Sequence, residues 1–123
     1  MKKARTHFVF WFIAIFCSLT FQTSAGSMHW RFTKQYSGAI DIKLFPIDRP
    51  AYSWPGKGKV YTMSSPEEWY LDISCRTGEK ICYGASPRNG RKIYWGVGLK
   101  NEYGCKGCCY FCNGGKTRLI ELR

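Results

Sequence analysis

Apolar and polar residues alternate along several short stretches of the chain, and this alternation predicts β-strands. Between Ile40 and Leu44 every second residue is aliphatic, with charged residues in between. A strand with this pattern places its apolar side chains on one face and its charges on the other. The same period of two runs through residues 69–75 and 93–99. We therefore expect half-buried strands of an antiparallel sheet at all three places.

Turn-forming residues separate the predicted strands. Asn89 and Gly90 lie midway between the apolar runs at residues 81–85 and 93–99, and Asn-Gly is the strongest short signal for a β-hairpin. A similar Asn-Gly-Gly break precedes a last candidate strand at residues 116–122. The connections thus favour a chain that turns back on itself repeatedly.

The chain contains 13 glycines and 5 prolines, which favour short strands and turns over long helices. Residues 49–59 are rich in both and are predicted to form a loop. Residues 65–68, Ser-Pro-Glu-Glu, have the form of a capping box with proline at the first helical position, so we expect one helical turn there. The predicted fold is mainly β: a small antiparallel meander or sandwich-like domain, disulfide-stabilised, with at most one short helical turn.

The first 25 residues have the organisation of a cleavable export signal. Basic residues within the first five positions precede an apolar run at residues 8–16, and small residues end at Ala25. The apolar stretch is shorter than the roughly 20 residues that a transmembrane helix needs. The Met-Lys-Lys start is typical of a bacterial signal peptide. We expect cleavage before Gly26 and export to the periplasm or the extracellular space, which are oxidising compartments.

Cleavage changes the composition that has to be interpreted. Removing 25 of 123 residues, with 3 of 19 basic residues and 1 of 7 cysteines, leaves one domain of 98 residues at 26–123, with a formal charge of +8 and six cysteines. Ile, Leu and Val together number only 14 there, so aliphatic burial alone would leave the domain marginally stable. We expect three disulfides among the cysteines, which are Cys75, Cys82, Cys105, Cys108, Cys109 and Cys112.

Two arrangements of the disulfides remain open. A short turn after Arg76 would place Cys75 opposite Cys82 and allow a local bridge. In the other arrangement, Cys75 and Cys82 each pair with the cluster at residues 105–112 and so tie down an otherwise structureless loop. We prefer the second arrangement, because a local bridge adds little that a hairpin lacks.

The cluster at residues 105–112 contains two abutting C-x-x-C units. Four thiolates can surround a zinc ion, so an envelope metal-binding protein is one alternative. Zinc ribbons, however, place their two pairs on separate turns, and an exported chain meets oxidants before it meets metal. We expect structural disulfides, with no metal and no cofactor.

Side chains suited to catalysis are scarce. His29 is the single histidine after the predicted cleavage site and lies near a chain end, where residues are often mobile. Glu67 and Glu68 are explained by capping, and no glycine-rich phosphate-binding motif is present. We therefore interpret the protein as a non-enzyme.

Basic residues stand next to aromatic residues at two places, in the loop at 49–59 and around the turn at 88–94. Most tyrosines and tryptophans are expected to fill a core that is short of aliphatic residues, but some should be exposed, and tyrosine and tryptophan are favoured at interfaces. A cationic, aromatic surface suits an anionic partner. The predicted binding residues are Tyr52, Trp54, Lys57, Lys59, Arg88, Arg91, Lys92, Tyr94 and Tyr103.

These observations favour an exported binding protein, an accessory, inhibitor or immunity-type protein that acts on another envelope or secreted protein. The alternative in a different class is a cationic effector that binds anionic membrane lipids or cell-wall polymers. Export argues against a nucleic acid as partner. The positive charge also has a simpler explanation, because dispersed charge keeps a protein soluble.

Overall fold

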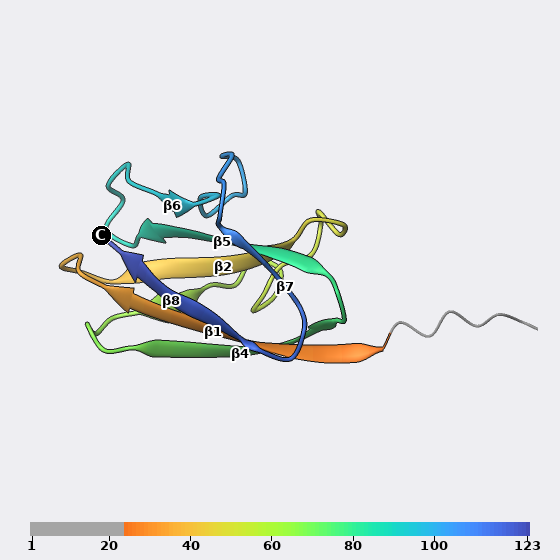
Figure 1. Cartoon of the computed structure of the whole chain (residues 1–123). Coiled ribbons are helices and arrows are strands. Elements are labelled where there is room, and N and C mark those ends of the chain that lie inside the picture. The colour runs from red at the N-terminus through yellow and green to blue at the C-terminus, as the bar shows by residue number, and fades with distance from the viewer. Residues whose placement is uncertain (1–23) are drawn as a thin grey trace, which may run out of the picture.

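A computed structural model describes residues 24–123, and these form two packed sheets (Figure 1). The predicted export signal, residues 1–25, lies outside this part apart from Ser24 and Ala25. Within residues 24–123 there is no helix long and apolar enough to cross a membrane. The strands are β1 (Ala25–Lys34), β2 (Ile40–Pro46), β3 (Tyr61–Met63), β4 (Trp69–Arg76), β5 (Lys80–Pro87), β6 (Trp95–Gly96), β7 (Cys109–Phe111) and β8 (Lys116–Leu122).

The first sheet has the order β4-β1-β8. Strand β1 lies in its centre, antiparallel to β4 from the pair Ala25–Arg76 to the pair Phe32–Trp69. On its other side β1 runs parallel to β8, with a register shift between His29 and Arg31. In a simple meander each strand pairs with its neighbour in sequence. Here the first strand, β1, pairs with the last, β8, so the topology differs from a simple meander.

The second sheet has the order β3-β2-β5-β6, and β7 also pairs with β5. All its pairs are antiparallel. Strands β5 and β6 form the hairpin that the Asn-Gly signal predicts, and Gly90 in its connection has a positive φ of 80°. In Figure 1 this sheet lies above the first one, with β7 crossing at one side.

The core lies between the sheets and is rich in aromatic side chains. Trp30 and Phe32 on β1 are fully buried. The Tyr110 ring stands edge-on to Trp30 at 5.2 Å between centroids, and the Tyr83 ring stands edge-on to Phe32 at 5.6 Å. Large rings thus supply much of the buried area that a small number of aliphatic residues cannot, as expected from the composition.

Three disulfides link the six cysteines of the domain, and the preferred arrangement is confirmed. Cys75 at the end of β4 pairs with Cys112, and Cys82 on β5 pairs with Cys109 on β7. The third bridge joins Cys105 to Cys108 within one loop. The first two bridges hold the segment around β7 against both sheets, because β4 belongs to the first sheet and β5 to the second.

The structure confirms the strands predicted at residues 40–44, 69–75, 81–85 and 116–122, and corrects two other predictions. Residues 93–99 form only the two-residue strand β6, because Gly96 and Gly98 adopt positive φ values of 63° and 75° and turn the chain. Residues 65–67 form bends in place of the predicted helical turn at 65–68, and no helix occurs within residues 24–123. There the Ser65 hydroxyl accepts a hydrogen bond from the Trp69 indole at 3.4 Å.

Candidate functional site

The loop at residues 49–59 carries the first group of predicted binding residues. Tyr52 is exposed to 46%, and Lys57 and Lys59 are also exposed. The Arg49 guanidinium lies 4.4 Å from the centroid of the Tyr52 ring, a cation–π contact. Arg49 also forms an ion pair with Glu79. The guanidinium is therefore held in place, and its cation–π contact restricts the Tyr52 ring on one face.

The predicted exposure of Trp54 is wrong. Its side chain is only 6% exposed and belongs to the main core. The Trp54 backbone bridges to Leu44 on β2, and its indole N–H donates a hydrogen bond of 3.1 Å to the Ser74 carbonyl on β4. A polar, proline-containing loop suggested a surface residue, but this indole has an apolar body to bury and a donor that β4 satisfies. Trp54 thus connects the loop to both sheets.

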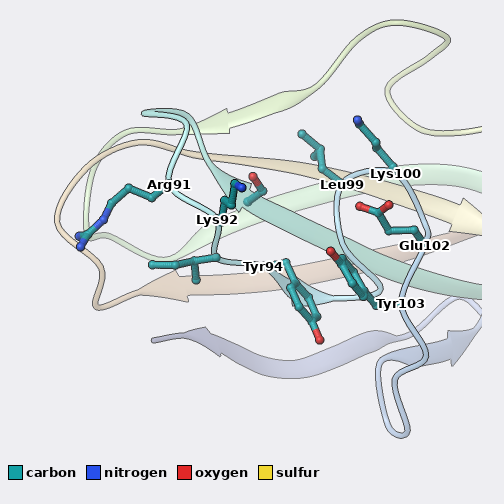
Figure 2. Close-up of a pocket in the computed structure, with 9 residues that line it drawn as sticks. Arg91, Lys92, Tyr94, Leu99, Lys100, Glu102 and Tyr103 are labelled. Carbon is teal, nitrogen blue, oxygen red and sulfur yellow. The ribbon is translucent and has the colours of Figure 1, made fainter.

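The second group converges on a surface hollow of about 270 Å³, which we call the tyrosine pocket. Tyr94 and Tyr103 stack face to face there, with 3.8 Å between ring centroids and 8° between ring planes. Both rings remain exposed, to 48% and 42%. Figure 2 shows the two rings side by side. The pocket is lined by Ser86, Arg91, Lys92, Ile93, Tyr94, Leu99, Lys100, Glu102 and Tyr103.

Close backbone approaches fold the segment that carries Tyr103. A Cβ added to Gly84 on β5 would lie 1.9 Å from the Gly98 carbonyl oxygen, so a glycine is required where this turn crosses β5. A Cβ added to Gly98 would lie 2.6 Å from Cδ2 of Tyr103. The Tyr103 amide donates a 3.1 Å hydrogen bond to the Val97 carbonyl. The Tyr103 ring therefore packs directly against the backbone at Gly98, where a side chain would collide with it.

Positive charge dominates the rim of the tyrosine pocket. Arg91, Lys92 and Lys100 stand against a single carboxylate, Glu102. Within residues 24–123 no salt bridge involves any of these four side chains. In Figure 2 the Arg91 side chain extends away from the ring pair, whereas Lys100 and Glu102 lie next to each other. None of the three cations is paired with a carboxylate in this part of the chain, so they leave the rim of the pocket with a net positive charge, with Arg91 at its outer edge.

Arg88 is close in sequence to this group but does not line the pocket. Its guanidinium donates a hydrogen bond of 3.2 Å to the Thr62 hydroxyl on β3. The neighbouring Asn89 amide donates to the Tyr36 hydroxyl at 3.0 Å, and this bond is the main reason that the pKa of Tyr36 is lowered. Arg91 lowers the pKa of Tyr36 further, against the opposite effect of burial. These bonds hold the 88–91 turn against the loop that follows β1.

Lys100 and Glu102 were not among the predicted residues, and neither were the apolar wall residues Ile93 and Leu99. Ile93 and Leu99 flank the short strand β6 within residues 93–99, whose alternation predicts a regular strand, and Lys100 and Glu102 follow that segment. The signal that was available is the pair of glycines two residues apart at 96 and 98, since glycine within a strand often marks a bend or a close backbone approach.

The remaining candidate chemistry lies elsewhere. All six cysteines of residues 24–123 are paired in disulfides, and this part of the chain holds no cluster of His, Cys, Asp and Glu suited to a metal ion. His29 is not at a loose end: it lies in β1, and its Nδ1 is 2.6 Å from Oδ1 of Asp72 on β4. This pair lies on the open outer face of the first sheet, with the Asp72 side chain 70% exposed.

Comparisons with protein-family models, curated proteins and solved structures find no match for this chain. A hollow with a flat aromatic wall and a cationic rim can hold a small apolar or planar group together with a negative charge.

Proposed function

We propose that this chain is an exported binding protein that acts without catalysis on another envelope or secreted protein, as an accessory, an inhibitor or an immunity-type protein. We place its contact surface at the tyrosine pocket. The observation that carries the proposal is the stacked pair Tyr94–Tyr103, which stays exposed to 48% and 42% inside a cationic hollow.

The composition of the pocket supports a protein partner. Tyrosine and arginine are enriched at protein interfaces and at the residues that contribute most to binding. A ring already stacked against a second ring loses little conformational freedom when a partner covers it, so its burial is favourable. Three cations against one carboxylate select an acidic or carboxylate-bearing group on the partner.

The disulfides support an oxidising compartment and a rigid scaffold. Two of the three bridges connect the segment around β7 to β4 and β5, and disulfides persist mainly outside the reducing cytosol. A rigid, cross-linked β domain presents preformed surfaces, which is the usual requirement for inhibitors and accessory proteins that bind without changing shape.

The proposal is tested by capture followed by measured affinity. Envelope and secreted fractions of the source cells are passed over the immobilised protein, and each retained protein is purified and titrated with wild type, Tyr103→Ala and Arg91→Glu. Both variants should weaken binding about tenfold, the loss expected when an interface anchor is truncated. Lys59→Glu makes the same charge change in the other loop and should leave the affinity unchanged.

Two results would count against the proposal. A partner that binds all three variants as tightly as wild type would move the contact surface away from the tyrosine pocket. Binding that disappears steeply between low and high salt, and that any anionic polymer competes away, would instead favour a charge-driven effector.

A further inference from the structure

A second exposed patch lies on the outer face of the second sheet, where β5, β7 and the residue directly after β2 present one row of side chains. Lys80 on β5 pairs directly with Phe111 on β7. On the other side of Lys80, the Ile47 amide donates a 3.0 Å hydrogen bond to the Lys80 carbonyl and continues the β2–β5 register. Directly opposed residues project from the same face of a sheet. Ile47, Lys80 and Phe111 therefore form one cross-strand row.

This row continues an apolar strip that begins inside the protein. Two residues along each strand, Phe45, Cys82 and Cys109 form the preceding row on the same face. Phe45 and Cys82 are buried under Val97 and pack with Cys105 and Cys109 in a second, smaller core. The loop that carries Val97 and Cys105 thus covers one row of the strip and leaves the next one open.

The open row is apolar at its two ends and strongly exposed. Ile47 is 51% exposed and Phe111 is 59% exposed. The Lys80 ammonium lies 6.0 Å from the centroid of the Phe111 ring. Phe111 also lines a hollow of about 250 Å³ together with Lys116, whose side chain is exposed. Phe111 thus contacts one lysine and shares a surface hollow with a second.

The chemistry of this patch selects a lipid surface over a second protein. Lysine is depleted in the core of protein interfaces, whereas a protruding aromatic ring beside ammonium groups is typical of side chains that sit among anionic headgroups. Residues 26–123 carry 16 basic against 8 acidic residues, so the domain as a whole is attracted to a negatively charged membrane. Two acidic residues adjoin the patch in sequence, Asp48 next to Ile47 and Glu79 next to Lys80. Asp48 lines a different hollow, and Glu79 is buried and paired with Arg49.

We propose that Ile47 and Phe111 dock this protein on an anionic phospholipid surface, with Lys80 and Lys116 at the level of the headgroups. This lipid-binding patch is distinct from the tyrosine pocket, since the two share no lining residue. The membrane contact and the partner contact of the proposed function therefore use different side chains.

The experiment is co-sedimentation with vesicles of phosphatidylcholine alone or with about one quarter phosphatidylglycerol added. We expect binding to the anionic vesicles only. Phe111→Ser and Lys80→Gln should each lower the partition coefficient about fivefold. Phe111→Ser removes a ring that is buried in the lipid on binding, and Lys80→Gln removes a positive charge near the headgroups. Tyr70→Ser is the matched control, since Tyr70 on β4 is also 59% exposed but hydrogen-bonds Glu68 rather than facing a lysine.

A second readout places the ring itself. In a Phe111→Trp variant, brominated anionic lipid should quench tryptophan emission more than in wild type, whose tryptophans in the described domain lie in or against the core. Equal quenching, or an unchanged partition coefficient for Phe111→Ser, would overturn the proposal. Absence of binding to anionic vesicles would overturn it as well. Arg91→Glu tests independence: it should weaken partner binding about tenfold and leave at least half of the vesicle binding, so failure of one proposal does not imply failure of the other.

Discussion

The nested order of two disulfides predicts how much stability each one contributes. Cys75–Cys112 spans 37 positions and encloses Cys82–Cys109, which spans 27. Alone, each would close a loop long enough to stabilise the fold by about 4 kcal/mol through lost chain entropy. With the other bridge present, the shortest closed path runs through both bridges and contains only about 12 residues, which lowers the contribution of each to about 3 kcal/mol.

Each bridge is removed by replacing both of its cysteines with alanine. Loss of either nested bridge alone should lower the free energy of unfolding by about 3 kcal/mol. Loss of both should lower it by about 1 kcal/mol more than the sum of the two single losses. Cys105–Cys108 closes only four residues, so its removal should cost about 2 kcal/mol. A domain of this size has a free energy of unfolding of about 5–15 kcal/mol, so the variant that lacks both nested bridges should be close to unfolding.

The assay is urea unfolding followed by tryptophan fluorescence, with Trp30 as the most buried reporter. The free energies of unfolding in water are compared with wild type, each extrapolated with the variant's own m-value, because loss of a bridge loosens the unfolded chain. Two results would refute the reasoning: a loss for the Cys105–Cys108 variant as large as that for either nested bridge, or a double loss smaller than the sum. Either one would mean that the bridges act through native packing and not through the unfolded chain.

Two further predictions separate packing from binding. Trp54→Ala should lower the free energy of unfolding by about 3–5 kcal/mol, as expected for a buried tryptophan. Tyr52→Ala should lower it by less than about 1 kcal/mol, and urea unfolding measures both changes. Gly98→Ala should weaken partner binding by displacing Tyr103, whereas Gly90→Ala, at a similar positive φ with no atom within 4 Å of the added Cβ, should change only stability. Equal affinities for these two glycine variants would contradict the role given to the Gly98 contact.

Local patterns in the sequence were sufficient to predict much of the second sheet. Alternation places Ile40 and Leu44 correctly on the inner face of β2, and the Asn-Gly turn lies where β5 bends back towards β6. The disulfide partners of Cys75 and Cys82 also follow from a physical argument, because bridges to the C-terminal cluster restrict a loop that has no regular structure. Each of these inferences depends on neighbours in sequence or on loop closure alone.

Strand partners depend on contacts between distant residues, and these could not be predicted. The parallel pairing of β1 with β8 joins residues more than 80 positions apart, and nothing local to either strand specifies it. The alternation of Met28, Trp30 and Phe32 marks an inner face in β1, but it lies next to the predicted cleavage site, where a loose end was expected.

The candidate site was predicted only in part, for the same reason. Proximity in sequence brought Arg91, Lys92 and Tyr94 together, and the structure brings Tyr103, which was predicted separately, to the same pocket through the turn at Gly98. Whether an aromatic residue in a loop faces water depends on what lies beneath the loop. For Trp54 that is a gap between two sheets, which the loop sequence alone does not show.

The ion pair between Arg49 and Glu79 makes the stability of this domain depend on pH. Glu79 is buried, accepts hydrogen bonds of 2.7 and 2.9 Å from Arg49, and accepts one of 3.0 Å from the Arg76 amide. Burial alone would raise the pKa of Glu79, but these bonds lower it below its usual 4.5. Since the folded pKa is the lower one, the ionised pair stabilises the fold above the unfolded value, and this contribution is lost as the pH falls through the folded value.

Glu79→Gln should therefore lower the free energy of unfolding by about 2 kcal/mol at pH 7, the contribution of hydrogen bonds to a charged group. The difference from wild type should shrink as the pH falls below 4.5. Urea unfolding across this range measures it, and Glu121→Gln, which removes the more exposed pair with Arg123, should have little effect at any pH. A difference for Glu79→Gln that stays constant with pH would mean that the shape of this side chain matters and its charge does not.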